Sequence, residues 1–248
     1  MTEIATSLDE LLGGRVRLIQ PQGGLRAAID PVLLAAAIPV KSGEQVLEAG
    51  CGTGAAALCL AARVAGVRVV GLDLQADLVA LARESASLNA MSGRVAFFAG
   101  DILAPPSQIA EPQFDHVMAN PPYMRAGSGH VSPDRSRALA SVEGAADLAS
   151  WVRFCVGRTQ PGGSVTFIHR ADRAAEVAAL LVAAGAEAAI CPLGPKRALI
   201  QGIKTVAGLA RQSIRHLPGL VLHEANGAFS TGAEAVLRHG QGLVITPR

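Results

Sequence analysis

The sequence contains few aromatic and few charged residues, and it has no long uncharged hydrophobic run. Aromatic residues make up 3% and charged residues 17% of the 248 residues, whereas hydrophobic residues make up 50%. A chain this hydrophobic is globular and not disordered. No stretch of ~18 apolar residues is free of charge, so we expect no membrane span and no membrane partner. The N-terminus lacks a basic segment followed by an apolar one, which argues against a signal peptide and predicts a cytoplasmic protein.

Cysteine is also scarce, and its spacing argues against two common roles. The four cysteines show neither the short spacing of metal ligands nor the pattern of a disulfide framework; they are Cys51, Cys59, Cys155 and Cys191. We therefore expect buried, reduced thiols and no bound metal.

The net charge of +2 is small, but the basic residues are unevenly distributed. No Asp or Glu occurs between residues 188 and 223, whereas this tract contains Lys196, Arg197, Lys204, Arg211 and Arg215. A phosphate backbone attracts a one-sided basic tract of this kind. An ordinary solvated surface is the alternative, because five charges over this length are not dense.

From residue 45 onward, short apolar runs alternate with helical patterns. Strands are predicted at 46–49, 67–72, 95–98, 114–119, 164–169, 186–191 and 198–206, and helices at 54–65, 76–89, 145–158 and 171–184. This rhythm predicts an α/β fold with a doubly wound, mostly parallel, seven-stranded sheet. Residues 220–243 suggest a further strand and a short helix. The length allows one sizeable core, which we place at residues 44–248.

Residues 1–43 are predicted to form a short extension of the main domain. The glycine pairs and apolar residues between positions 11 and 29, including Val16, Leu18 and Leu25, suggest a hairpin. A helix should follow over residues 32–38. Asp30 before Pro31 is a strong start signal, so capping this helix is the ordinary role expected of the Asp30 side chain, and a ligand contact is the alternative.

The strongest site signals follow the first three strands of the predicted sheet, where ligands of doubly wound folds bind. Residues 48–54 read Glu-Ala-Gly-Cys-Gly-Thr-Gly; glycines permit a sharp turn, and the N–H groups of the next helix favour an anion. An acidic residue also ends each of the next two strands, and these can bond ribose hydroxyls and an adenine amine. The candidate cofactor-binding residues are Glu48, Gly50, Cys51, Gly52, Gly54, Asp73, Leu74, Asp101, Ile102 and Asn120.

A nicotinamide dinucleotide is one alternative for this site. Gly50, Gly52 and Ala55 fit the dinucleotide fingerprint, and Asp73 has the expected spacing. Glu48 opposes that interpretation, because a carboxylate two residues before the first glycine repels a pyrophosphate. The same carboxylate suits a cationic sulfonium and amine. The sequence therefore favours S-adenosylmethionine.

The fourth strand ends in Asn120-Pro121-Pro122-Tyr123, and Tyr123 is the only tyrosine in the chain. Two prolines cannot continue a sheet ladder, and they restrict the residue before them, so this box forms a stiff corner. The Asn120 amide oxygen and the Pro121 carbonyl can accept the two hydrogens of an NH₂ group, and Tyr123 can stack on a planar ring. We predict that the four residues are catalytic. A polar turn that ends a strand is the alternative.

The glycine loop, Asp73, Asp101 and the box together resemble class I S-adenosylmethionine-dependent methyltransferases of the amino-group type, with a Rossmann-like fold. More closely, the chain resembles the bacterial adenine-N6 methyltransferases that act on a valine tRNA. Gly24-Leu25-Arg26 with residues 30–35, and residues 217–224 with Gly227, match the start and end of that family. The resemblance implies methyl transfer to an exocyclic amino nitrogen, adenine N6 in structured RNA such as tRNA.

Other acceptors remain open at this point, because adenine-N6 DNA enzymes and glutamine-N5 protein enzymes share the box. Glutamine-N5 enzymes usually carry a helical domain before the glycine loop, and here only about 45 residues precede it. A small-molecule methyltransferase and a non-enzymatic cofactor-binding scaffold are further alternatives. Family members often carry two aromatics in the box, whereas Met124 follows Tyr123 here. Additional phosphate contacts are expected from Arg125, Arg135 and Arg137.

Overall fold

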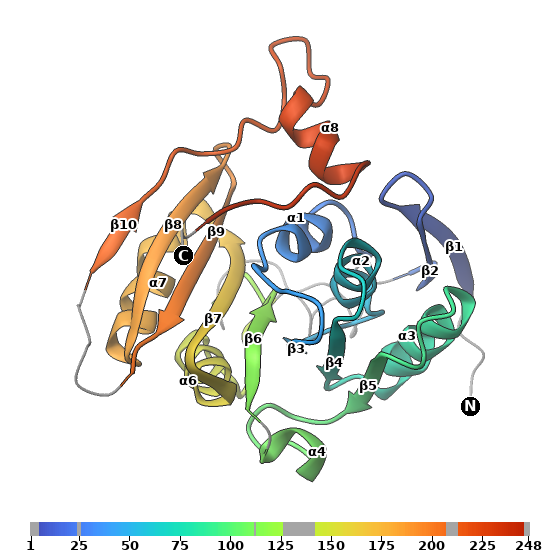
Figure 1. Cartoon of the computed structure of the whole chain (residues 1–248), viewed down its shortest axis with the longest axis horizontal. Helices are drawn as coiled ribbons and strands as arrows, with labels where there is room; N and C mark the ends of the chain where they lie inside the picture. Colours follow the sequence, from blue (N-terminus) through green and yellow to red (C-terminus); the bar gives the residue numbers. More distant parts are fainter. Residues whose placement is uncertain (1–4, 24–25, 112, 126–141, 207–212, 246–248) are drawn as a thin grey trace.

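A twisted, mostly parallel sheet forms the centre of the protein (Figure 1). The computed structural model describes residues 5–23, 26–111, 113–125, 142–206 and 213–245. Within them the sheet has eight strands, in the order β10 (Ile214–His216), β8 (Ala186–Leu193), β9 (Arg197–Lys204), β7 (Thr159–Arg170), β6 (Phe114–Ala119), β3 (Gln45–Ala49), β4 (Arg68–Asp73) and β5 (Val95–Ala99). Only β9 runs antiparallel to its neighbours, β7 and β8.

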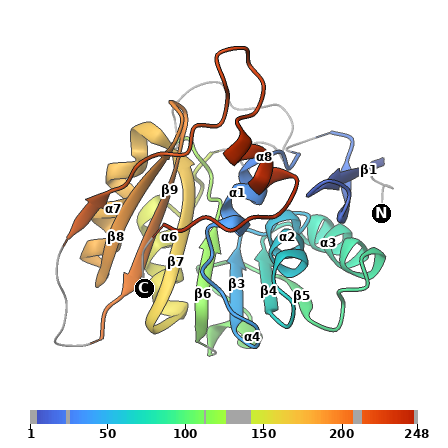
Figure 2. The same ribbon diagram turned by 45° about the horizontal axis from the view of Figure 1, so that its top comes forward.

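Helices cover both faces of the sheet, and each face has its own hydrophobic core (Figure 2). One core includes residues of α1 (Asp30–Ala36), α2 (Ala55–Arg63), α3 (Ala76–Leu88) and α8 (Thr231–Leu237), and the other includes residues of α4 (Ser107–Ala110), α6 (Leu148–Arg158) and α7 (Ala174–Ala183). In β3, Val46 belongs to the first core and Leu47 to the second, and neither is exposed. Burial on both faces explains why this strand carries apolar side chains at the consecutive positions Val46 and Leu47.

The predicted fold class is confirmed, and the differences lie at the ends of the chain. The seven predicted strands are present, and the three-residue edge strand β10 adds an eighth. The prediction of a strand within residues 220–243 is wrong, because β10 lies before that segment. The short helix predicted there is α8. The sequence also missed the four-residue helix α4, which is too short to show a helical period.

The N-terminal hairpin starts earlier than predicted and packs on the main domain. Its strands are β1 (Thr6–Leu11) and β2 (Val16–Pro21), whereas Leu25 lies outside the described residues. The first strand was missed because its sequence, Thr-Ser-Leu-Asp-Glu-Leu, is largely polar. Four hydrogen bonds attach β2 to the C-terminal part of α3 and its C-cap, among them Arg17 N–H to the Asn89 side chain (2.9 Å) and Ile19 N–H to Ser85 Oγ (3.0 Å). No helix in the described ranges is long and apolar enough to cross a bilayer.

Candidate active site

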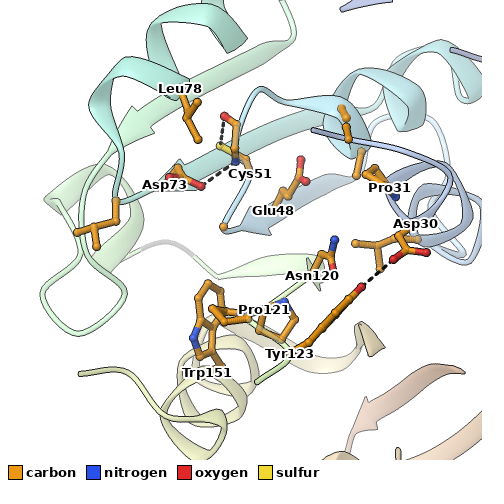
Figure 3. A pocket seen from close by; sticks show the side chains of 18 of the residues that line it. Asp30, Pro31, Glu48, Cys51, Asp73, Leu78, Asn120, Pro121, Tyr123 and Trp151 are labelled. Carbon is orange, nitrogen blue, oxygen red and sulfur yellow. Dashed lines mark hydrogen bonds between the residues drawn. The ribbon is translucent and has the colours of Figure 1, made fainter. Parts of the chain in front are cut away.

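A cavity of about 900 Å³ lies where β3, β4, β5 and β6 reach their carboxyl ends (Figure 3). The chain leaves β3 toward β4 on one side, while β6 lies on the other side, so this is the reversal point at which doubly wound folds bind ligands. All the predicted site residues but one line the cavity: Glu48, Gly50, Cys51, Gly52, Asp73, Leu74, Asp101, Ile102, Asn120, Pro121, Pro122 and Tyr123.

The exception is Gly54, which the sequence placed among the cofactor-binding residues. Gly54 precedes α2 with a φ of +83°, and a Cβ there would lie 2.6 Å from Phe97 Cζ. It is not among the residues that line the cavity. A side chain at this position would clash with the ring of Phe97, so close packing by itself accounts for a glycine here.

The other two glycines of the loop shape the cavity wall. Gly50 has a φ of +72°, and a Cβ at this position would lie 2.8 Å from the Trp151 ring. Gly52 has a φ of +52°, and a Cβ there would meet nothing within 4 Å. The Gly50 and Cys51 N–H groups both donate to the Leu72 carbonyl, at 2.8 and 3.0 Å. The loop is thus fixed to the end of β4 and leaves open space above Gly52.

Glu48 places a buried carboxyl group in the cavity beside the N-terminus of α2. Its Oε2 accepts a hydrogen bond of 2.8 Å from Ala57 N–H, and the residue is only 4% exposed. Burial raises the pKa of Glu48 to about 8, although the hydrogen bond from Ala57 acts in the opposite direction. A cationic group in the cavity would stabilise the ionised form of this carboxyl.

The two aspartates at the ends of β4 and β5 are partly occupied by their own loops. Asp73 accepts hydrogen bonds from Gly52 N–H (2.7 Å) and Gln75 N–H (2.8 Å), one on each carboxylate oxygen. Burial raises the pKa of Asp73, and both hydrogen bonds oppose that shift. Asp101 accepts from Leu103 N–H at 2.9 Å. Each carboxylate retains acceptor capacity toward the cavity, since an oxygen has two lone pairs.

Asn120 faces this pocket from the end of β6, with Glu48 on one side and Pro121 on the other (Figure 3). Its Oδ1 is buried and accepts no hydrogen bond from the part of the chain that the structure describes. A buried polar atom without a partner is unusual in a folded protein and calls for an explanation. A ligand donor in the cavity would supply the missing hydrogen bond.

The structure overturns the expected capping role of Asp30. The helix begins at Asp30 itself, its N-cap is Ile29, and no side chain caps it. The Asp30 carboxylate instead accepts a hydrogen bond of 2.9 Å from the Tyr123 hydroxyl. Tyr123 also lies beneath the Arg197 guanidinium, at 4.6 Å from the ring centroid, and contacts His169 edge-on at 5.1 Å. Tyr123 therefore contacts three side chains of the protein itself, in addition to the acceptor that it was predicted to contact.

The basic tract does not form one surface. Lys196 and Arg197 line the cavity at the start of β9. At the other end of that strand, Lys204 Nζ donates to the Val156 and Thr159 carbonyls, at 3.0 and 2.6 Å. Arg215 is exposed on β10, and Arg211 lies outside the described residues.

The arginines expected to extend the basic tract after the box do not add a free cation in the described ranges. Arg125 pairs with Glu176 at 2.9 Å. Arg135 and Arg137 lie outside those ranges. The four cysteines are free and buried, as predicted.

Sequence reasoning missed several residues that border the cavity. Trp151 on α6 lies against Gly50, and Arg170 reaches the cavity from the end of β7. Arg26 and Pro31 approach it from the N-terminal segment. One signal for Trp151 was available in the sequence, because it is the only tryptophan in the chain. The others come from distant segments, so no local pattern indicates them.

Comparisons with known proteins identify the fold and the domain. A family model described as a methyltransferase domain matches residues 40–148. A predicted O-methyltransferase from Agrobacterium tumefaciens superposes with a TM-score of 0.69 at 23% identity, over 88% of this chain and 100% of that one. TrmN from Thermus thermophilus gives 0.50 at 23%, over 74% and 50%. The fold is that of the class I S-adenosylmethionine-dependent methyltransferases, and the predicted enzyme class and cofactor are thereby confirmed.

Within this class, the chain resembles enzymes named tRNA1(Val) (adenine(37)-N6)-methyltransferase. It is 27% identical to that of Tolumonas auensis over 67% of this chain and 68% of the relative, and 28% identical to that of Aeromonas hydrophila over 83% and 86%. A release factor glutamine methyltransferase from Shewanella oneidensis is also similar, at 29% identity over 60% of this chain and 52% of that enzyme. The domain and the reaction class are common to both groups, whereas the acceptors in their names differ.

Proposed function

We propose that this enzyme transfers a methyl group to an exocyclic amino nitrogen, adenine N6 in structured RNA such as tRNA. The observation that carries the proposal is the buried, unpartnered Oδ1 of Asn120 beside the cavity. Two prolines follow it, so this oxygen and the Pro121 carbonyl have fixed directions. With a tRNA acceptor, the enzyme would act in the cytoplasm.

The polar groups that line the cavity are chemically suited to S-adenosylmethionine. We propose that Asp73 accepts hydrogen bonds from the ribose hydroxyls, that Asp101 and Ile102 contact the adenine, and that Glu48 faces the positive charge of the sulfonium and amine. The open space above Gly52, at the N-terminus of α2, suits a carboxylate. When bound, the cofactor supplies an electrophilic methyl group on sulfur.

The residues of the box would then prepare the acceptor nitrogen. The lone pair of an aromatic or amide NH₂ is delocalised, which makes the nitrogen a poor nucleophile. Asn120 Oδ1 and the Pro121 carbonyl would accept its two hydrogens and favour a tetrahedral nitrogen with the lone pair directed at the methyl. Both hydrogen bonds strengthen as positive charge develops on nitrogen, so they lower the barrier. Pro122 keeps the corner stiff, and Tyr123 offers its ring to a planar acceptor.

Two observations support an RNA acceptor. Relatives named for valine tRNA align over up to 83% of this chain. Lys196 lies at the cavity, where it can meet a phosphate next to the target base. We also propose that the extension of residues 1–43, whose strands β1 and β2 pack on the main domain of residues 44–248, completes the acceptor side.

Protein glutamine-N5 methylation is the second candidate, because release factor glutamine methyltransferases are among the relatives. The same two acceptor oxygens would hold a glutamine NH₂, so Asn120 does not discriminate between the candidates. A small amine or amide is a third possible acceptor.

Tritiated methyl transfer to separate RNA, DNA and protein pools tests the proposal. Label that is recovered from RNA as N6-methyladenosine is expected, and label confined to protein would favour the glutamine reaction. Asn120→Ala should lower methyl transfer at least ~100-fold, because an oriented acceptor contributes a few kcal/mol in the transition state. Cofactor affinity by calorimetry should change little.

Asn226→Ala, on an exposed turn, is the matched control and should behave like the wild type. Near-normal turnover of Asn120→Ala would remove the proposed role of the amide. The pools and the variant address different points, since the first identifies the acceptor and the second the group that orients it.

A further inference from the structure

Tyr123 is held by two charged residues that are far from it in the sequence. Asp30 Oδ2 accepts hydrogen bonds from the Tyr123 hydroxyl and from Arg197 Nε, both at 2.9 Å. The Arg197 guanidinium also lies over the tyrosine ring, 4.6 Å from its centroid. Asp30 opens α1, Tyr123 ends the box and Arg197 begins β9, and all three line the cavity. Figure 3 shows the contact between Tyr123 and Asp30. We refer to these three residues as the Asp30 cluster.

The cluster fixes both the tip and a face of the tyrosine. The hydroxyl hydrogen is used by Asp30, so it is not available to an acceptor. A cation over the face of the ring adds an electrostatic attraction. The side chains of Asp30 and Arg197 are 19% and 31% exposed, so water screens their attraction only in part. What remains for an acceptor is a ring in one fixed orientation.

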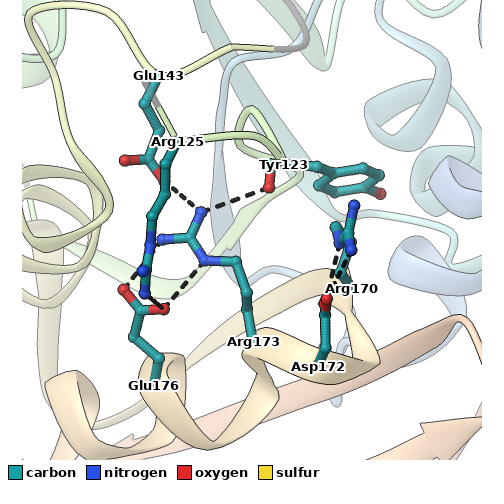
Figure 4. Close-up of polar contacts among 7 residues, drawn as sticks. All are labelled: Tyr123, Arg125, Glu143, Arg170, Asp172, Arg173 and Glu176. Atoms are coloured by element: carbon teal, nitrogen blue, oxygen red, sulfur yellow. Dashed lines mark hydrogen bonds and ion pairs between the residues drawn. The ribbon is translucent and has the colours of Figure 1, made fainter. Parts of the chain in front are cut away.

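The backbone of Tyr123 is anchored separately, at its carbonyl, which lies on the side opposite to its hydroxyl (Figure 4). Arg173 donates to the Tyr123 carbonyl at 3.4 Å. Arg173 is itself held by Glu143 and, at 3.0 Å, by both oxygens of Glu176. The residue after the two prolines is thus secured at its carbonyl and at its hydroxyl.

We propose that Asp30 and Arg197 are positioning residues for the acceptor, and that they act by holding the Tyr123 ring as a fixed wall of the acceptor side. Through Asp30, the N-terminal helix α1 becomes part of that side. The inference rests on the proposed function in one respect: the acceptor is a group that lies against the tyrosine. Neither residue touches the reacting atoms in this mechanism.

The kinetic test uses Asp30→Ala, Asp30→Asn and Arg197→Lys, with whichever acceptor pool the wild type methylates. A misplaced ring should lower kcat/KM for the acceptor by ~10–100-fold, because small errors in orientation are costly in the transition state. Cofactor affinity should stay within about twofold, since these residues lie on the acceptor side. Arg197→Lys keeps the charge but loses the planar group, and it should fall between Asp30→Ala and the wild type.

Glu234→Gln is the matched control, because Glu234 forms a partly exposed ion pair with Arg238 on α8, away from the cavity. It should leave kcat/KM unchanged. Should Asp30→Ala fail to fold, Tyr123→Phe replaces it: the ring stays and the hydroxyl contact is lost. Normal acceptor kinetics in Tyr123→Phe would overturn the proposal.

Coupling between the residues distinguishes positioning from independent effects. If Asp30 acts only through the hydroxyl of Tyr123, adding Tyr123→Phe to Asp30→Ala should produce little further loss of kcat/KM. Additive losses would show that Asp30 works by another route and would overturn the proposal.

A readout that needs no acceptor comes from the single tyrosine of the chain. Burial, followed by the negative charge of Asp30, raises the pKa of Tyr123, whereas Arg197 acts in the opposite direction. The ultraviolet absorbance of tyrosinate should therefore appear at lower pH in Asp30→Ala than in the wild type. An unchanged titration would show that the cluster does not exist in solution.

A changed titration with normal acceptor kinetics would show that holding the ring is irrelevant to the reaction. Methylation of protein instead of RNA would refute the proposed acceptor and leave both tests of the cluster intact.

Discussion

Replacing Glu48 with glutamine should remove one contribution to the pH dependence of stability of the ligand-free protein. Burial raises the pKa of this carboxyl from 4.5 to about 8. Between these two values, the folded protein retains a proton on Glu48 that the unfolded chain has lost. The contribution of Glu48 to the unfolding free energy therefore falls as pH rises from about 4.5 to about 8. Glutamine has the same shape, can accept the hydrogen bond from Ala57, and does not titrate.

The magnitude follows from the size of the pKa difference. At about 1.4 kcal/mol per pKa unit, the full shift corresponds to about 5 kcal/mol of unfolding free energy. On the order of 3–4 kcal/mol of that should be lost between about pH 5 and pH 8. Glu48→Gln should match the wild type to within about 1 kcal/mol at the lower pH and exceed it by several at the higher pH.

Urea unfolding of the two proteins across this pH range measures the effect, with the m-value expected to stay constant. Cofactor binding should show the converse behaviour. A sulfonium next to Glu48 favours the ionised carboxyl, so wild-type affinity should rise with pH up to about 8, and Glu48→Gln should bind more weakly there. S-adenosylhomocysteine has no sulfonium charge and should show a smaller pH dependence.

Parallel stability curves for the wild type and Glu48→Gln would refute the reasoning, because Glu48 would then not titrate in this range. Glu84→Gln, on the exposed side of α3, controls for the general effect of removing one carboxylate. It should change stability by less than about 1 kcal/mol at every pH.

Two further predictions concern the cofactor loop. Asp73→Ala should weaken cofactor binding by ~10–100-fold in calorimetry, since hydrogen bonds to a charged group are worth about 1.5–3 kcal/mol each, and unchanged affinity would contradict the ribose assignment. Gly54→Ala should lower the unfolding free energy by ~1–3 kcal/mol, because the methyl group would meet Phe97 at 2.6 Å. Gly43→Ala separates strain from this clash: its φ is +90° with nothing within 4 Å, so it should lose only ~1 kcal/mol, and equal losses would contradict the packing argument.

Much of the site could be predicted because ligands of a doubly wound sheet bind at the carboxyl ends of its strands. Apolar runs locate the strands, so the residues after each run are known to meet at one edge. Glu48, Asp73, Asp101 and Asn120 were found in this way, and all four line the cavity.

Gly54 shows where the same reasoning fails. The loop motif indicates that a glycine is needed there, but a motif cannot separate close packing from contact with a ligand. Only the position of Phe97, which lies on β5, shows that packing is the reason. Similarly, the sequence shows how many basic residues the tract contains but not where they lie on the surface. Arg197 and Lys204 lie at opposite ends of β9.

The sequence by itself determined the order of strands and helices, the glycine turn and the stiff corner at Asn120, because each depends on residues a few positions apart. Tertiary structure alone decided the environment of Tyr123. Asp30 lies 93 positions from Tyr123 and 167 from Arg197, so no local pattern joins them. The start signal at Asp30 was read as a helix cap, since capping is the local use of an aspartate before proline. Its actual partners become neighbours only when β6 and β9 approach α1 in the folded sheet.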